Sequence, residues 1–405
     1  MKKILVLGGG ADQIDLILDL KERGYYTILV DYYPNPVAKP YADKHIQEST
    51  LDKETVLEIA KRENVENVIT ACTDQALVTV AYIAEKLGFH KQFTFHQARN
   101  ITNKLYMKEI MIANNIPTAK YVNIHCLDEG LSNLSYPLMV KPADCNSSKG
   151  VRKVDNEREL KIAFDNAIKV SRTHTAIVEE YKKGMEVSVD AFVENRNVHL
   201  LMCSEIKKLQ HDRSLSIIYQ SIIPAYLSNL QITKIEAIIN KIVESFDLDN
   251  TPVLVQLLVD DNDINVIEFS ARIGGGLKHV NIKEKTGFDI LHENVNAVLG
   301  EPVRFYRNDN PLCLSRTHLY VHPGVFSSIS NYEQLIEDGT IVELNTIKGS
   351  GFVIEEISAS GDRVGNFLVK AENRDLLFQK INKAINTIRV LDINGKDILY
   401  RELYK

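Results

Sequence analysis

The chain has 405 residues, of which 25% are charged and 44% belong to the hydrophobic class, and its 54 acidic and 48 basic side chains give a net charge of −6. This composition suits a folded protein of two or three domains and excludes wholesale disorder, collagen-like repeats and low-complexity sequence. The mildly acidic balance also argues against a general nucleic-acid binder.

The cysteines and the N-terminus indicate the compartment. The five cysteines are scattered without any Cys-x-x-Cys pair, which is typical of reduced thiols and spells no zinc site. The apolar run after the N-terminal lysines, residues 4–7, is shorter than the ~7–15 residues of a signal-peptide core. No stretch approaches the ~18 apolar residues of a membrane span. We therefore expect a cytoplasmic protein with neither a membrane nor a nucleic-acid partner.

The first part of the chain alternates strands and helices, which predicts a parallel sheet in a Rossmann-like domain. The expected strands are residues 4–7, 27–30 and 68–71, and the expected helices are residues 13–23, 53–64 and 74–87. A glycine turn, residues 8–10, follows the first strand.

This turn resembles part of a dinucleotide fingerprint. Gly8 and Gly10 fit Gly-x-Gly-x-x-Gly and Asp31 supplies the acid about twenty positions on, but Gln13 stands where the third glycine belongs. A tight strand-to-helix turn is the favoured interpretation, and an NAD site is the alternative.

The pattern changes after residue 103. A helix over residues 104–115 is followed by short strands with basic and glycine-containing turns through about residue 191, and by a strand at 198–203. Further on, we expect a helix at 233–246, strands at 253–259 and 264–269, and a helix at 375–388.

Three segments of this part of the chain, called stations below, contain residues suited to ligand binding or catalysis. At the first, Lys141 ends an apolar strand, where a buried ammonium needs an anionic partner such as a phosphate. The turn that follows offers hydroxyls, amides and a second cation, as phosphate-cradling loops do. A surface hairpin with solvated lysines explains the same residues equally well. The turn residues are Ser147, Ser148, Lys149 and Gly150.

At the second station Glu186, Ser188 and Asp190 alternate with apolar residues, which predicts a half-buried strand with a row of carboxylates on one face. Carboxylates suit ribose hydroxyls, and an exposed polar face is the plainer alternative.

The third station pairs Gln256 with Glu268. If Asp261–Asp263 form a three-residue hairpin loop, these two side chains face each other with Ser270 on the same side, an oxygen set that suits Mg²⁺. A four-residue loop would shift the register by one and break the pairing. Arg272 stands just beyond, where it suits charge on a transferring phosphoryl group, and a glycine triplet, residues 274–276, lets backbone approach a ligand.

In this order and spacing the three stations resemble the ATP-grasp superfamily of ATP-dependent ligases, over essentially the whole chain and closest to the amino-acid ligases and carbamoyl-phosphate-synthase-like ligases. The resemblance implies an α/β fold whose lobes are α+β. It implies a Rossmann-like pre-ATP-grasp domain (residues 1–97), a two-lobed ATP-grasp domain (98–305, flexible lobe about 118–181) and a small α+β cap (306–405).

The resemblance also assigns roles. Lys104 and Lys141 resemble the phosphate-contacting lysines, and the turn from Ser147 to Gly150 resembles the flexible phosphate loop. Glu179 with the backbone of Glu180 and Tyr181 looks like the adenine hinge, and Glu186 like the ribose carboxylate. Gln256, Glu268 and Ser270 look like the metal ligands, although serine replaces the usual asparagine. Arg272, Lys141 and Lys149 take the catalytic roles.

The implied reaction activates a carboxylate with ATP and Mg²⁺ (Mn²⁺ is the alternative ion), passes through an acyl phosphate and forms an amide with an amine, releasing ADP and phosphate. The alternatives are an ATP-binding module with little or no turnover, which Ser270 motivates, and a purine-pathway-like or carboxylating enzyme. The partners are then a small carboxylate and an amine, and because members of the superfamily are often dimers, a homodimer is one expectation.

For the carboxylate pocket the candidates lie between the glycine triplet and the cap: Gly275, His279 and Arg316, whose guanidinium could fork onto a carboxylate. The basic segment of Lys207, Lys208, His211 and Arg213 is interpreted as a solvated loop.

Overall fold

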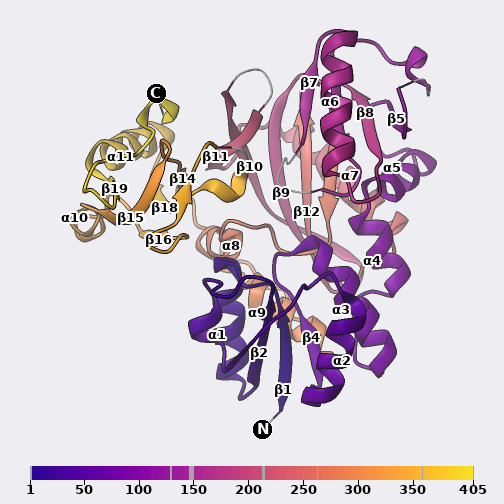
Figure 1. The fold of residues 1–405 in the computed structure, drawn as a ribbon, viewed down its shortest axis with the longest axis horizontal. Helices are drawn as coiled ribbons and strands as arrows, with labels where there is room; N and C mark the ends of the chain where they lie inside the picture. The colour runs from indigo at the N-terminus through magenta and orange to yellow at the C-terminus, as the bar shows by residue number, and fades with distance from the viewer. Residues whose placement is uncertain are drawn as a thin grey trace.

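The computed structural model describes residues 2–127, 130–145, 150–211, 215–261, 263–357 and 359–404. Figure 1 shows the N-terminal region in indigo, the central region in magenta to orange and the C-terminal region in yellow, packed around one another. Among the described helices none is both long and apolar enough to span a membrane. The five cysteines form no disulfide with one another.

The N-terminal region is a parallel sheet, as predicted, but it has four strands in the order β3-β2-β1-β4, and β3 was not expected. Its strands are β1 (Lys3–Leu7), β2 (Tyr26–Asp31), β3 (Lys44–Gln47) and β4 (Asn67–Ile69). The helices are α1 (Ile14–Glu22), α2 (Lys53–Glu63), α3 (Asp74–Leu87) and α4 (Phe95–Thr102). Residues 4–7 of β1 are fully buried because α1 packs on one face of the sheet while α2 and α3 pack on the other.

Neighbouring side chains pack against the glycine turn after β1 and form hydrogen bonds with it. The Asp31 carboxylate accepts hydrogen bonds from the amides of Gly9 (2.7 Å) and Tyr33 (2.8 Å), and a Cβ on Gly9 would lie 2.4 Å from Pro36. The buried Gln13 side chain donates to Thr70 and accepts from the Ala71 amide. These contacts occupy the groups that a dinucleotide would use, so the geometry favours the tight-turn interpretation over the NAD site.

The central region begins with α5 (Lys104–Ala113) and a small antiparallel sheet of order β5-β8-β6-β7. Its strands are β5 (Tyr121–Ile124), β6 (Leu138–Pro142), β7 (Arg152–Val154) and β8 (Ala176–Glu180). The prediction of short strands alone through residue 191 is wrong, because the helix α6 (Glu157–Val170) covers this sheet. Asn156 caps that helix by accepting from the Glu159 amide at 3.0 Å, a start signal that the sequence contains.

An eight-stranded antiparallel sheet of order β13-β12-β9-β10-β11-β14-β18-β16 joins the central and C-terminal regions. Its strands are β9 (Met185–Glu194), β10 (Asn197–His211), β11 (Leu215–Ile223), β12 (Thr251–Val259), β13 (Ile264–Ser270), β14 (Cys313–Leu319), β16 (Glu343–Thr346) and β18 (Gly365–Ala371). The sheet therefore crosses the border predicted at residue 305, and the cap is built on a shared sheet.

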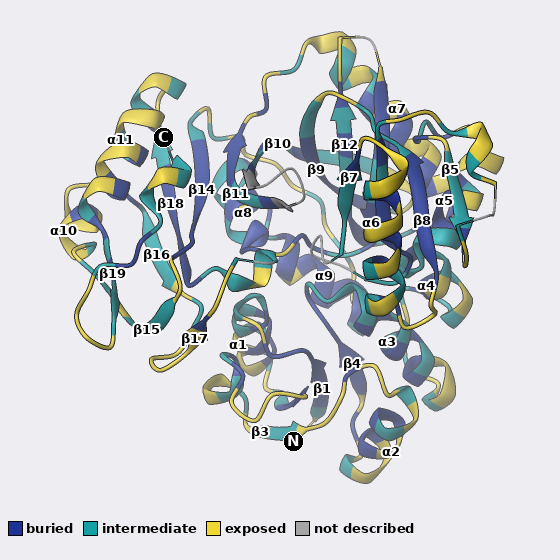
Figure 2. Cartoon of the chain, turned by 45° about the horizontal axis from the view of Figure 1, so that its top comes forward, coloured by how far each residue is buried: buried dark blue, intermediate teal, exposed yellow. Residues whose placement is uncertain are grey.

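Helices and a second small sheet complete these regions. The remaining helices are α7 (Asn229–Ser245), α8 (Lys278–Thr286), α9 (Ile290–Leu299), α10 (Glu333–Glu337) and α11 (Arg374–Thr387). The strands β15 (Gly324–Ser330), β17 (Val353–Ile354) and β19 (Arg389–Asp392) form a three-stranded sheet. Figure 2 shows the buried strands in blue and the solvent-facing sides of α6 and α11 in yellow.

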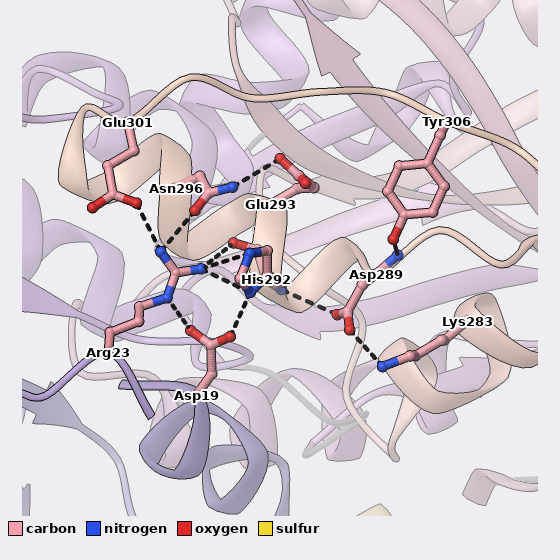
Figure 3. Close-up of polar contacts among 9 residues, drawn as sticks. All are labelled: Asp19, Arg23, Lys283, Asp289, His292, Glu293, Asn296, Glu301 and Tyr306. Carbon is pink, nitrogen blue, oxygen red and sulfur yellow. Dashed lines mark hydrogen bonds and ion pairs between the residues drawn. The ribbon is translucent and has the colours of Figure 1, made fainter. Parts of the chain in front are cut away.

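A polar cluster fastens α1 to α9 (Figure 3). Arg23 binds Asp19 at 2.7 Å, Asn296 at 2.7 Å and Glu301 at 2.8 Å, and Asp19 also accepts from His292 at 2.7 Å. Single exposed ion pairs contribute little, but a network whose members share partners loses less conformational entropy for each contact. The N-terminal region is thereby attached to the segment that follows the glycine triplet.

Candidate active site

A cavity of about 490 Å³ lies between the small β5–β8 sheet and the large sheet. Met139, Met185, Ile206 and Leu258 supply apolar walls, which suit a flat aromatic ring. Eight of the predicted site residues line the cavity: Lys104, Lys141, Glu179, Glu180, Tyr181, Glu186, Gln256 and Glu268. The fold thus brings together residues that are up to 164 positions apart in the sequence.

Lys141 and Glu179 form a buried ion pair across β6 and β8, and sequence reasoning missed its third member, Lys108. The Lys108 ammonium, 3% exposed, lies 3.0 Å from Glu179 and 2.8 Å from the Thr118 hydroxyl. Burial alone would raise the pKa of Glu179, but the two lysines outweigh it and lower that pKa to about 2. Glu179 is therefore an anion that orients Lys141 toward the cavity.

Lys104 and Glu268 form an ion pair in the lining of the cavity. The Lys104 ammonium is 3.2 Å from the Glu268 carboxylate and 2.7 Å from the Cys145 carbonyl oxygen. Lys104 is the main cause that lowers the pKa of Glu268, so that carboxylate is ionised and suited to a cation.

Gln256 and Glu268 are directly opposite each other, as predicted, but for a different reason. The three-residue loop is wrong, because Val259 pairs with Ile264 and four residues lie between the strands. A β-bulge between Gln256 and Leu257 absorbs one residue of β13, Ile267, and restores the register that the predicted pairing needs.

Glu186 points into the cavity next to a lysine. Its Oε2 is 2.6 Å from the Lys208 ammonium, while its Oε1 is buried without a hydrogen-bond partner in the described part of the chain. An orphaned carboxylate oxygen of this kind fits a ribose hydroxyl. The solvated-loop interpretation is wrong for Lys207 and Lys208, which lie in β10 and line the cavity.

The rest of the polar row of β9, Ser188 and Asp190, is buried rather than exposed, because β9 is central between β10 and β12. Ser188 and Asp190 are 3% and 2% exposed, and both bind the Lys278 ammonium, at 2.6 and 2.5 Å. Burial raises the pKa of Asp190, and Lys278 opposes that rise. This pair stabilises the sheet behind the glycine triplet and does not line the cavity.

Two backbone amides of the predicted adenine hinge already donate hydrogen bonds within the protein. The Glu180 amide donates to the Lys120 carbonyl and the Tyr181 amide to the Pro137 carbonyl, both at 2.9 Å. The carbonyl groups of this segment and the next cavity residue, Lys182, therefore stay as candidates for the purine edge.

Ser270 and Arg272 do not line the cavity; both bind Asp74 at the start of α3. Arg272 meets that carboxylate with two nitrogens, at 2.6 and 2.5 Å, and the Ser270 hydroxyl adds a hydrogen bond. Burial raises the pKa of Asp74, but Arg272 and Ser270 lower it more. Ser147, Ser148 and Lys149 lie outside the described residues, and Gly150, with φ of +75°, packs against Pro142.

The three residues predicted to bind the substrate, Gly275, His279 and Arg316, do not line the cavity. Gly275 lies beside Asp12, whose carboxylate accepts from the next two amides, of Gly276 (3.3 Å) and Leu277 (2.6 Å). His279 Nε2 donates to the Asp15 carboxylate at 2.6 Å. Arg316 is 1% exposed, so the structure does not bring it to a ligand. Its guanidinium is satisfied internally by Asn281, Glu343 and Asn366.

A better-placed cation, Arg363, was missed because no local motif marks it. It lies against Gly276, 3.4 Å from His318. Within the described part of the chain no carboxylate comes within ion-pair distance of it. Arg363 is therefore an additional candidate for binding an anion beside the glycine triplet.

The lowered pKa of the buried His318 side chain predicts that the stability of the fold depends on pH. Burial, then the charges of Arg363 and Arg316, hold its pKa well below the ordinary 6.5. Because the unfolded chain binds this proton below about pH 6.5 and the folded chain does not, stability is full above that pH and falls as the pH drops, by up to about 1.4 kcal/mol per unit. We expect His318→Gln to flatten this slope in denaturant titrations between pH 7 and 5. An unchanged slope, with the exposed His322→Gln as control, would contradict the assignment.

The comparisons with known proteins agree with this geometry. Residues 134–280 match the sequence family described as ATP-grasp domain. The chain is 24% identical, over 67% of its length, to the carbamoyl phosphate synthase large chain of Pseudothermotoga lettingae, but it spans only 26% of that longer protein.

Two solved structures share the fold at low identity. L-amino acid ligase from Bacillus licheniformis aligns with a TM-score of 0.82 at 20% identity, covering 97% of this chain and 99% of that one. The biotin carboxylase domain dimer of Hydrogenobacter thermophilus 2-oxoglutarate carboxylase, solved with MgADP, gives 0.79 at 16% identity, covering 96% and 90%. Residues 134–280 are therefore an ATP-grasp domain, and the chain around it shares the overall fold of these two structures.

Proposed function

We propose that this chain is an ATP-dependent carboxylate–amine ligase. The γ-phosphoryl group of ATP passes to a carboxylate, ADP leaves, and an amine displaces phosphate from the acyl phosphate to form an amide. The observation that carries the proposal is the meeting of Lys104, Lys141 and the Gln256–Glu268 pair around one cavity with apolar walls.

Gln256 and Glu268 would hold Mg²⁺, which supplies charge neutralisation at the phosphate oxygens. In the described residues no three His, Cys, Asp or Glu side chains form a metal cluster. A cation held by one carboxylate and one amide takes its other ligands from phosphate and water, as Mg²⁺ commonly does.

The chain's own groups would do the rest by positioning and charge. Lys141, oriented by Glu179, and Lys104 neutralise the phosphates, and the unpartnered oxygen of Glu186 binds the ribose. The apolar walls limit water near an acyl phosphate that would otherwise hydrolyse.

Arg363 is the proposed anchor for the carboxylate end of a substrate. We expect Arg363→Gln to raise the KM of the acid by at least about 10-fold, because a charge-assisted fork is lost, and to leave the KM of ATP unchanged. Steady-state ADP release at varied acid and varied ATP separates the two constants. A shift in the KM of ATP alone would refute this placement.

A nucleotide-binding module without turnover is the second candidate, because Ser270 binds Asp74 and does not line the cavity. Screening the purified chain for ADP release with amino acids, singly and in pairs, and with bicarbonate decides between them. ADP release that needs both an acid and an amine supports the ligase. Release with bicarbonate supports a carboxylating enzyme, and MgATP binding without release with any of them supports the module.

A further inference from the structure

Asp74 lies where the N-terminal region meets the central region. It is the first residue of α3, in the N-terminal region, and its carboxylate binds Arg272 of the central region through two hydrogen bonds. Both side chains are largely buried, at 18% and 12% exposure, so the pair is little screened by solvent.

The paired arginine keeps unused donors. A guanidinium has five N–H groups, of which two donate to Asp74 and one to the Ile273 carbonyl at 2.6 Å. In the described part of the chain the other two N–H groups have no acceptor, and the orientation of the guanidinium is fixed. Arg272 also interacts electrostatically with Glu268, and Asp74 with Lys104, so the pair lies near two residues that line the cavity, although it does not line the cavity itself.

The glycine turn, whose polar groups make hydrogen bonds within the fold, helps to fix Asp74. A Cβ on Gly8 would lie 2.8 Å from the Thr73 hydroxyl, and the Gln13 amide donates to that hydroxyl at 3.4 Å. The start of α3 is thus held against the turn, and only glycine allows this close approach at a φ of +95°.

We propose that Asp74 is a positioning residue for phosphoryl transfer: it holds Arg272 and Ser270 in one arrangement beside Glu268, so that the free guanidinium donors are preorganised for the γ-phosphate. This inference rests on the proposed function. By this proposal the N-terminal region contributes to phosphoryl transfer through Asp74, without itself binding a ligand.

The test is a double-mutant cycle with Asp74→Asn and Arg272→Ala. Asp74→Asn keeps the side-chain shape and removes the charge that fixes the fork, so we expect kcat for ADP release to fall about 100-fold with the KM of ATP within threefold. The double variant should be no slower than Arg272→Ala alone. Asp74→Glu, which restores the charge, should recover part of the rate.

Asp19→Asn is the matched control. It removes another acid that joins the N-terminal region to the central region, at the α1–α9 cluster of Figure 3, and does not touch Arg272. We expect it to lower the melting temperature with kcat unchanged. The proposal would be overturned by an equal loss of kcat in Asp19→Asn or by additive losses in the double-mutant cycle. Unchanged or faster turnover in Asp74→Asn would also overturn it.

A binding readout separates this proposal from the proposed function. The ratio of the Kd for ADP to the Kd for AMP-PNP measures recognition of the γ-phosphate without turnover. The ratio should fall by no more than about threefold, in line with the small change in the KM of ATP, and equally in Asp74→Asn, in Arg272→Ala and in the double variant. If the wild-type chain releases no ADP with any acid and amine, the ligase proposal fails, and this ratio still decides whether Asp74 orients Arg272.

Discussion

Replacing Glu268 with glutamine is expected to lower the rate of ADP formation by about 10²–10³-fold. The carboxylate lies opposite Gln256 and 3.2 Å from Lys104, and it is the ionised ligand of the proposed Mg²⁺ pair. Glutamine keeps the shape and removes the charge, so the cation should bind more weakly and the apparent Mg²⁺ requirement should rise. Rates measured across a Mg²⁺ titration test both effects.

Asp263→Asn is the control for this variant. Asp263 is exposed at the turn between the same two strands and does not line the cavity, so its loss should leave the rate and the Mg²⁺ dependence unchanged. Wild-type turnover in Glu268→Gln would contradict the metal assignment. A folded Glu268→Gln chain, checked by its melting curve, is required for the comparison to hold.

Replacing Glu179 with glutamine should give the largest loss of stability, about 3–5 kcal/mol. The variant leaves the ammonium groups of Lys141 and Lys108 buried without their shared anion. ATP affinity should also fall, because Lys141 loses the carboxylate that orients it. Denaturant unfolding and nucleotide titration measure the two effects.

The same residue gives a pH signature. Because the pKa of Glu179 is lowered from 4.5 to about 2 in the folded chain, its contribution to stability is present above about pH 4.5 and is lost as the pH falls toward 2. This part of the acid dependence should be missing in Glu179→Gln. Adding Lys108→Met to Glu179→Gln should recover part of the lost stability, since one uncompensated cation is removed. No recovery in the double variant would show that the ion pairs do not account for the loss.

The elements could be predicted where periodicity is strong and local. The span of α3 and the strands of the 251–270 hairpin follow from their apolar patterns, and α6 was available from its cap at Asn156. The pairing of Gln256 with Glu268 was predicted from a loop length that is wrong. The bulge at Ile267 compensates for that error, and no rule applied to the sequence indicates a bulge there.

The contacts that sequence could not supply join distant segments. Asp74 and Arg272 are 198 positions apart in the sequence, and no sequence motif contains both residues or indicates that they are in contact. Lys108 and Arg363 are ordinary basic residues in the sequence, and only the folded chain places one against Glu179 and the other against Gly276. Arg316, by contrast, was a candidate because its guanidinium could fork onto a substrate carboxylate. In the folded chain that guanidinium binds Asn281, Glu343 and Asn366 instead.

A crystal structure of the full chain with AMP-PNP and Mg²⁺ tests the central claim most directly. We predict the triphosphate in the cavity between the small and large sheets, with Lys104 and Lys141 on its phosphates and a cation between Gln256 and Glu268. A nucleotide bound at the Gly8–Gly10 turn or elsewhere, with this cavity empty, would contradict the account.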